Sequence, residues 1–210
     1  MADTSNSNKP DKEDKQLVKP SDKTDDKKKR DKQWQFSFLL EQFKKESDRA
    51  AVILVASMLD ELLCTLLKTY LVAMPTSDDS LFDSPTSPLS TFSSKIDIAF
   101  RLGLISGKFA RDMHIVRRIR NSFAHDIYGC SFENGSVKSR IRELEKSILF
   151  SSNIDSASRK DDLLDGDRGM FIFVTGTMIW KLSGQIREVS ELKECDLEWF
   201  YKEEAKAKKL

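Results

Sequence analysis

This 210-residue chain is poor in cysteine, histidine, glycine and proline. Its three cysteines, Cys64, Cys130 and Cys195, are widely spaced, and with only two histidines they form no zinc-ligand spacing. The sequence therefore predicts reduced thiols, and neither a metal site nor a cofactor. It also lacks a glycine-rich phosphate loop, a nucleophile elbow and paired carboxylates at a catalytic spacing, which leaves few enzyme classes open.

An excess of one charge is also missing, because 35 Lys and Arg face 34 Asp and Glu, for a formal net charge of +1. A nucleic-acid binder without sequence preference usually carries a basic excess, so any nucleic-acid site must be local. No apolar signal region opens the chain, and the longest apolar run is interrupted by Asp60 and Glu61. That run is expected to be too short and too charged to span a membrane, which predicts a cytoplasmic protein with no membrane partner.

The apolar residues that are present, 39% of the chain, are enough for one core and predict one folded domain. Residues 1–33 contain ten Lys or Arg, eight Asp or Glu and two prolines, with almost no large apolar side chain. Such a segment cannot bury enough surface to offset its ordering entropy, so it is predicted to be a disordered charged tail. The helical domain is then expected over residues 34–200, followed by a basic C-terminal end over residues 201–210.

Helical periodicity runs through this domain and predicts an all-α bundle of about six helices. Ser47 or Asp48, Ser90 or Thr91, and Ser106 are the expected N-caps of three of them. Residues 170–192 include a strand-like run, but their length and apolar spacing favour a helix. The expected helices cover residues 34–44, 48–70, 91–103, 107–125, 136–150 and 170–192, and polar loops cover residues 75–91, 126–135 and 151–167.

The helix that ends at His125 carries an arginine on its apolar side. At about 100° per residue, Arg120 falls inside a stripe of apolar side chains, whereas Arg117 and Arg118 fall outside it. A buried arginine is costly without a partner, so Arg120 should meet a carboxylate, a bound anion or a cleft that reaches water. Asp60 lies on an apolar face of the long second helix, so Asp60 and its neighbour Glu61 are candidate partners. The stripe consists of Phe109, Met113, Val116, Ile119 and Phe123.

Lys95 is another charge in an unfavourable place, because it lies near a helix start, where the dipole does not favour a cation. We expect Lys95 to reach Asp60, Glu61 or Asp97, or else a bound anion. If Lys95, Arg117 and Arg120 converge on one cleft, they form an anion site suited to phosphate. Together with Arg118, these three are the candidate binding residues.

A combination of short motifs resembles the MltR (mannitol operon repressor) family over roughly residues 46–190. The resemblance implies an all-helical, cytosolic bacterial protein that regulates transcription, commonly of carbohydrate uptake genes. We expect such a regulator to be a homodimer that acts by binding a protein partner or nucleic acid rather than by chemistry. The motifs are Leu81-Phe82-Asp83, Pro88-Leu89, Phe92-Ser93-Ser94-Lys95-Ile96, Leu102-Gly103-Leu104-Ile105 and the stretch from Arg117 to His125.

Arg120, Asn121 and His125 are also similar to the R-x4-6-H signature of HEPN domains, helical bundles that often dimerise and in some cases cleave RNA without a metal. The resemblance implies that His125 would act as acid or base, Arg120 would stabilise the phosphorane charge and Asn121 would orient the phosphate. Five residues rotate a side chain by about 140° along a straight helix, so one site needs a helix end or a second chain. The alternative is a structural Arg120 and a His125 favoured at the helix C-terminus. An RNA-binding or RNA-cleaving module therefore stays open beside the regulator.

Overall fold

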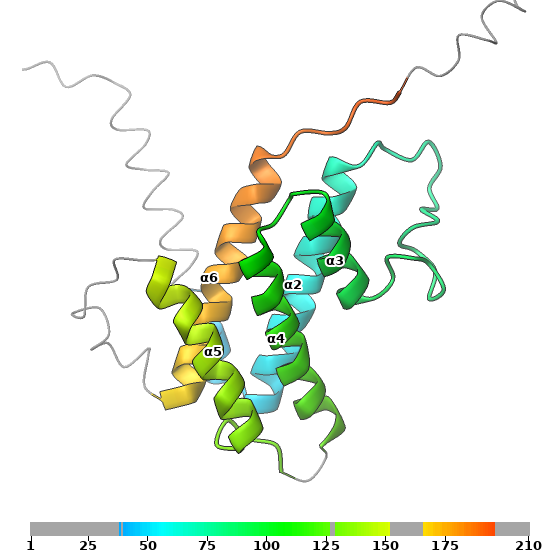
Figure 1. Cartoon of the computed structure of the whole chain (residues 1–210). Coiled ribbons are helices and arrows are strands. Elements are labelled where there is room, and N and C mark those ends of the chain that lie inside the picture. The colour runs from blue at the N-terminus through cyan, green and yellow to red at the C-terminus, as the bar shows by residue number, and fades with distance from the viewer. Residues whose placement is uncertain (1–37, 39, 127–128, 152–165, 196–210) are drawn as a thin grey trace, which may run out of the picture. The chain divides into compact units, whose positions relative to one another are not determined.

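The computed structural model describes residues 38, 40–126, 129–151 and 166–195, and its regular elements there are all helices. The predicted all-α fold is confirmed. The chain divides into two units, Met1–Gln35 and Phe36–Leu210, and the bundle belongs to the second. The predicted tail and the basic C-terminal end lie outside the described residues. The labelled helices are α2 (Asp48–Tyr70), α3 (Phe92–Arg101), α4 (Gly107–His125), α5 (Gly135–Ser151) and α6 (Gly166–Glu188), and residues 40–45 form a short helical segment before α2 (Figure 1).

Helix α2 lies at the centre of the bundle. It packs against α3, α4 and α6, while α5 packs against α4 and α6 (Figure 1). Leu59, Leu63 and Leu66 of α2 have no solvent-exposed surface. Burying a leucine side chain contributes roughly 1.5 to 3 kcal/mol, so these three residues are a main source of the cohesion between the helices.

The apolar character of α2 corrects one expectation from the sequence. By length and composition the helix could cross a membrane, because an 18-residue window has a mean hydropathy of 2.1 despite Asp60 and Glu61. The prediction that this run is too short and too charged is therefore wrong. Within the bundle 44% of that window is buried, and one helix that passes by length and composition alone is weak evidence for a membrane span.

Side-chain caps set the starts of the three helices that surround the candidate site. Each capping hydroxyl accepts a hydrogen bond from a backbone amide three residues ahead, which satisfies one of the free donors at a helix start. The three predicted caps are confirmed, with Thr91 chosen over Ser90 and Ser47 over Asp48. The pairs are Ser47 with Ala50, Thr91 with Ser94, and Ser106 with Phe109.

A tight turn joins α3 to α4 and brings their ends together. Gly103 has a φ of 73°, a conformation that glycine adopts without the penalty of a Cβ atom. The Gly103 amide donates to the Phe100 carbonyl and the Leu104 amide donates to the Ala99 carbonyl, which is the Schellman pattern of a helix end. The turn directs α4 back along α3, so both helices face α2.

Candidate functional site

A cleft opens between α2, the beginning of α3 and the second half of α4. Its volume is about 380 Å³, within the range of small-ligand sites. Most of the residues along it are polar, and they come from three segments far apart in the sequence. The lining residues are Ala56, Ser57, Asp60, Ser90, Thr91, Phe92, Ser93, Arg117, Arg120 and Asn121.

Arg120 lines this cleft as an exposed side chain and is not buried in the core. Its Nη1 donates a hydrogen bond of 3.2 Å to the Oδ1 of Asn121. No ion pair within 4.0 Å joins it to Asp60 or Glu61 in the part of the chain that the structure describes, and of the three alternatives from the sequence the cleft that reaches water is the one found. The reason is geometric. Arg120 lies only about 20° around the helix from the buried Met113, but at its level along α4 the start of α3 leaves a cleft, through which the long side chain reaches water.

Lys95 is the partner of Asp60. Its Nζ donates to Asp60 Oδ1 at 2.7 Å, as one of the sequence alternatives predicts, and Lys95 is only 8% exposed. A buried ammonium needs such a partner, because removing it from water alone is costly. The pair neutralises the one carboxylate on the cleft lining, whereas Glu61 is exposed and does not line the cleft.

Arg117 gives the cleft a half-buried cation. Its Nε is buried and has no hydrogen-bond partner among the described residues. An unpaired buried donor costs roughly 1 to 3 kcal/mol, and more when it is charged. Two of the three predicted cations, Arg117 and Arg120, therefore converge on one cleft, while the third, Lys95, is held by Asp60.

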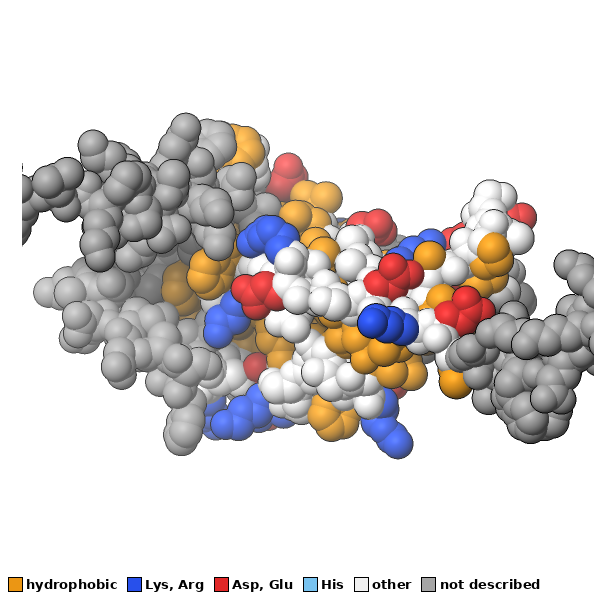
Figure 2. Space-filling model, turned by 90° about the horizontal axis from the view of Figure 1, so that it is seen from above, with side chains coloured by type: hydrophobic (Ala, Val, Ile, Leu, Met, Phe, Trp, Pro, Cys, Tyr) orange, Lys and Arg blue, Asp and Glu red, His pale blue; other side chains and the backbone are white. Residues whose placement is uncertain are grey.

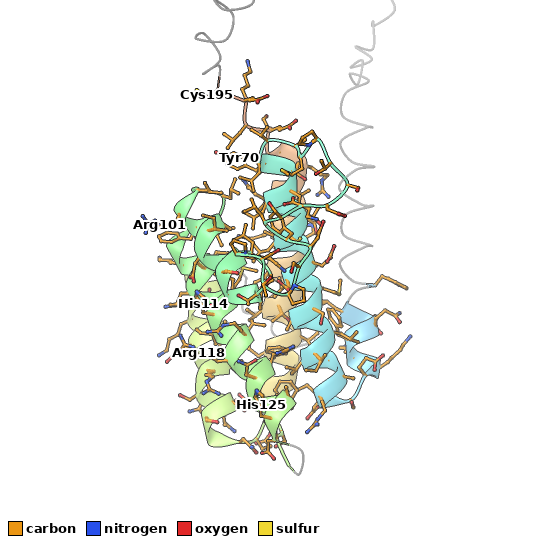
Figure 3. The ribbon with its side chains drawn as sticks, turned by 90° about the vertical axis from the view of Figure 1, so that its right-hand side faces the viewer. Tyr70, Arg101, His114, Arg118, His125 and Cys195 are labelled. Carbon is orange, nitrogen blue, oxygen red and sulfur yellow. The ribbon has the colours of Figure 1, made fainter. Side chains whose placement is uncertain are left out.

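The remaining predicted side chains on α4 point elsewhere. Arg118 is exposed and does not line the cleft. His125 is exposed at the end of α4 (Figure 3). His114, an earlier histidine of the same helix, has its Nε2 3.0 Å from Asp97 Oδ1. The cleft thus gathers Arg120 and Asn121 without His125. One chain does not assemble the three-residue arrangement that the HEPN resemblance implies, and a contribution from a second chain stays a prediction.

The described residues offer little to nucleophilic or metal chemistry. No group of three or more His, Cys, Asp or Glu side chains in this part of the chain could hold a metal ion. Burial raises the pKa of the Cys64 thiol and of the Cys130 thiol, so the reactive thiolate form is disfavoured at both. Neither thiol lines the cleft.

The sequence interpretation missed Asp112, a carboxylate on the buried side of α4. The residue is 7% exposed and accepts hydrogen bonds from Arg111 Nη2 at 2.8 Å and from Ser147 Oγ of α5 at 3.0 Å. The signal was available, because Asp112 lies only about 20° around the helix from both Ile119 and Phe123. Asp112, rather than Arg120, is the buried charge of the apolar stripe, and it links α4 to α5.

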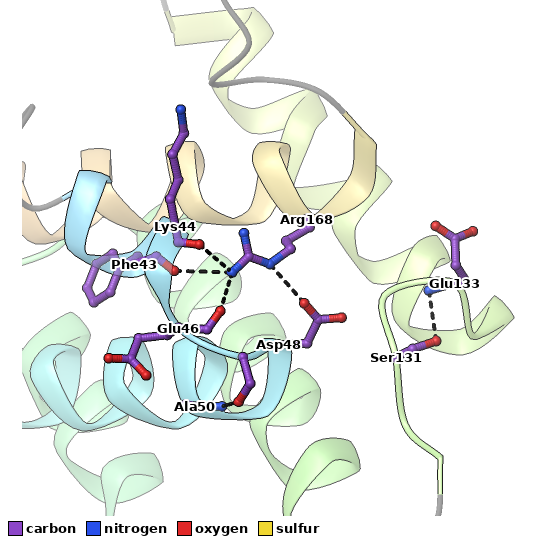
Figure 4. Close-up of polar contacts among 9 residues, drawn as sticks. Phe43, Lys44, Glu46, Asp48, Ala50, Ser131, Glu133 and Arg168 are labelled. Carbon is purple, nitrogen blue, oxygen red and sulfur yellow. Dashed lines mark hydrogen bonds and ion pairs between the residues drawn. The ribbon is translucent and has the colours of Figure 1, made fainter.

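Arg168, near the start of α6, is a second residue that the sequence interpretation missed. Its Nη2 donates to the carbonyl oxygens of Phe43, Lys44 and Glu46, and its Nε donates to Asp48 at 2.8 Å (Figure 4). Carbonyls at a helix end have no partners within the helix. Arg168 therefore closes the end of the 40–45 segment and ties it to the cap region of α2.

The end of the bundle viewed in Figure 2 differs from the cleft, because acidic, basic and apolar side chains are interspersed there. The exposed apolar residues Val72 and Met74 follow α2, and Leu192 follows α6. The Leu192 amide donates to the Tyr70 carbonyl at 2.7 Å, which joins the chain after α6 to the end of α2. This surface carries no concentrated charge, so the cleft remains the candidate site.

No protein-family model matches the sequence, and no curated protein matches it. The fold is similar to that of a chain in the X-ray structure of the MtlR–HPr complex from Escherichia coli, with a TM-score of 0.51 and 19% sequence identity. The match covers 70% of this chain and 98% of the other. The described helices therefore have an MtlR-like fold, which supports the expected MltR resemblance at the level of architecture.

Proposed function

We propose that this protein is an MltR-like regulator that acts by binding another macromolecule, with a protein as the first candidate. The observation that carries the proposal is the MtlR-like fold, which spans 98% of a chain solved in a complex with HPr. A fold positions surfaces but does not by itself set a function. The site agrees with a binding role, because the cleft offers cations and hydroxyls but no His125.

The finer parts of the proposal follow from the resemblance of the sequence to the MltR family. By this resemblance, the proposed regulator is a bacterial, cytoplasmic and homodimeric repressor of carbohydrate uptake genes. The MtlR–HPr complex makes a protein of the HPr type the first partner to test. Binding of such a partner would control the regulator by occupying a surface rather than by changing its covalent structure.

Calorimetry and light scattering on the purified full-length chain with HPr from the same organism test this proposal. We expect a defined complex, and a homodimer mass for the protein alone. Transcript levels after deletion of the gene then test the repressor role, with uptake genes expected to rise. Absence of any complex with HPr together with unchanged transcripts would contradict the regulator proposal.

The same samples test the nuclease alternative. Since Arg120 and Asn121 line the cleft and His125 does not, we expect RNA to stay intact in EDTA at high protein concentration. Metal-independent cleavage that His125→Ala abolishes would overturn the preference for binding and favour a site completed by two chains. DNA binding through Arg117 and Arg118 would instead weaken steeply with added salt.

A further inference from the structure

We infer that the cleft between α2, α3 and α4 binds a phosphate monoester, held by Arg117, Arg120 and the first amides of α3. Phosphate binding here does not depend on the proposed regulatory role, because the three helices of one chain form the whole cleft. The ligand could be a free phosphorylated metabolite or a phosphorylated side chain. Both carry the same dianionic group.

The charges on the cleft favour a dianion. Arg117 and Arg120 are two cations on successive turns of α4, and Asp60 is the one carboxylate on the lining. Lys95 contacts that carboxylate at 2.7 Å, so the Asp60–Lys95 pair adds no net charge. The two arginines therefore remain uncompensated within the lining, and their charge matches the nearly two negative charges of a phosphate monoester at neutral pH.

Hydrogen-bond donors without acceptors also favour an anion in this cleft. Arg117 Nε is buried and unpaired in the described chain, which is an observation independent of the helix start. The Thr91 side chain and carbonyl accept from the Ser94 and Lys95 amides. The Phe92 and Ser93 amides precede these, and no hydrogen bond from either is found among the described residues. Free amides and the positive end of the dipole make the start of a helix a good place for phosphate.

The geometry favours a monoester over the backbone of a nucleic acid. The next arginine on α4, Arg118, lies outside the cleft, so no row of cations follows successive phosphates. The volume of about 380 Å³ exceeds the needs of one phosphate group, and the polar residues Ser57, Ser90 and Ser93 also line the cleft. A phosphate with a small polar substituent therefore suits the cleft.

Isothermal titration calorimetry on the full-length chain tests the inference, with inorganic phosphate, phosphoserine and a phosphoserine peptide as probes at constant ionic strength. We expect saturable binding of phosphate and tighter binding of at least one ester. Tighter binding of free phosphoserine identifies a metabolite-like ligand, and tighter binding of the peptide identifies a phosphorylated segment. No saturable heat with any of the three would overturn the inference.

Three matched variants of α4 separate a built site from general charge attraction. Each charge-assisted hydrogen bond contributes to the free energy of binding. Losing one in Arg120→Gln or in Arg117→Gln should therefore weaken binding by about tenfold or more. Arg118→Gln removes the same charge from the same helix outside the cleft and should change affinity less than about twofold. Equal losses in all three, or tighter binding of a single-stranded oligonucleotide than of any monoester, would contradict the inference. If Arg117→Gln does not fold, the exposed Arg120 still supplies the test.

Discussion

The Lys95 ammonium and the Asp60 carboxylate form a 2.7 Å ion pair that joins the first turn of α3 to the middle of α2. The Lys95 side chain is 10% exposed and the Asp60 side chain 33% exposed, so the two ends of the pair differ in their access to water. This contact also sets the charge of the cleft, because it compensates the carboxylate on the lining. The same ion pair therefore joins two helices and leaves the cleft with the charge of its arginines.

Breaking this pair should destabilise the fold. Lys95→Met leaves a half-buried carboxylate and Asp60→Asn leaves a buried ammonium, and each should lower the free energy of unfolding by about 1 to 3 kcal/mol. Asp60→Asn should cost more, because Lys95 is the more deeply buried partner. Urea denaturation of both single variants and the double variant measures the coupling. Strictly additive effects would argue against a direct interaction.

Arg120→Ala should leave stability nearly unchanged. Its side chain is exposed and contacts Asn121 on the same helix, so the expected change is within about 0.5 kcal/mol. Chemical denaturation of the variant beside the wild-type protein gives the answer. A loss of unfolding free energy comparable to that of Asp60→Asn would instead show that Arg120 makes a stabilising contact with the core.

Asp112→Ala should destabilise the contact between α4 and α5. The change removes the acceptor for Arg111 and Ser147 and leaves a small gap in a buried region, so about 1 to 3 kcal/mol should be lost. The measurement is the denaturant midpoint. Glu143→Ala on α5 is the matched control, because Glu143 is exposed and its loss should have little effect.

Arg168→Met should loosen the segment before α2. The variant keeps the apolar stem but removes the donors to three carbonyls and to Asp48, so we expect a loss of roughly 1.5 to 3 kcal/mol. Hydrogen exchange should accelerate for residues 40–46 more than for α3. Arg187→Met on the exposed side of α6 serves as the control. Unchanged exchange at residues 40–46 would show that other contacts hold this segment.

The loop after α2 should respond to acid. A hydrogen bond from the Asp79 amide and another from Lys68 lower the pKa of Asp83 below its ordinary 3.8. A group with a lowered folded-state pKa contributes stability above its unfolded pKa, and the contribution is lost as pH falls through the folded value. The effect should be small, because the carboxylate is exposed. Chemical shifts of the loop between pH 6 and about 2 should report it, and Asp83→Asn should remove the transition.

Capping residues predicted the starts of α2, α3 and α4 correctly, because a cap is a local property of the chain, whereas α6 begins at Gly166, four residues before the predicted start at residue 170. Thr91 and Ser106 illustrate this, since each hydroxyl needs only an amide three residues ahead. Lys95 also followed from a local rule, because a cation near a helix start requires a partner. Whether Lys95 pairs with Asp60, Glu61 or Asp97 depends on how α2 and α3 pack, and the sequence alone does not show this packing.

The error over Arg120 has a physical cause. A helical wheel gives directions around one helix, but it does not show at which level along the helix a neighbour covers the apolar stripe. At the level of Arg120 the start of α3 leaves a cleft, whereas at the level of Asp112 helix α5 closes the surface. Arg168 lay beyond such reasoning altogether, because its partners lie more than a hundred positions earlier in the chain.

The packing of α2 against α6 has a consequence for how the protein is made. Translation produces α2 (Asp48–Tyr70) long before α6 (Gly166–Glu188), so the face of α2 that packs against α6 stays uncovered until this last partner leaves the ribosome. Long-range contacts form late, and exposed apolar surface promotes aggregation while they are missing. A chain that stops after α5 would keep the α6-facing side of α2 in water, and chaperones should bind that product.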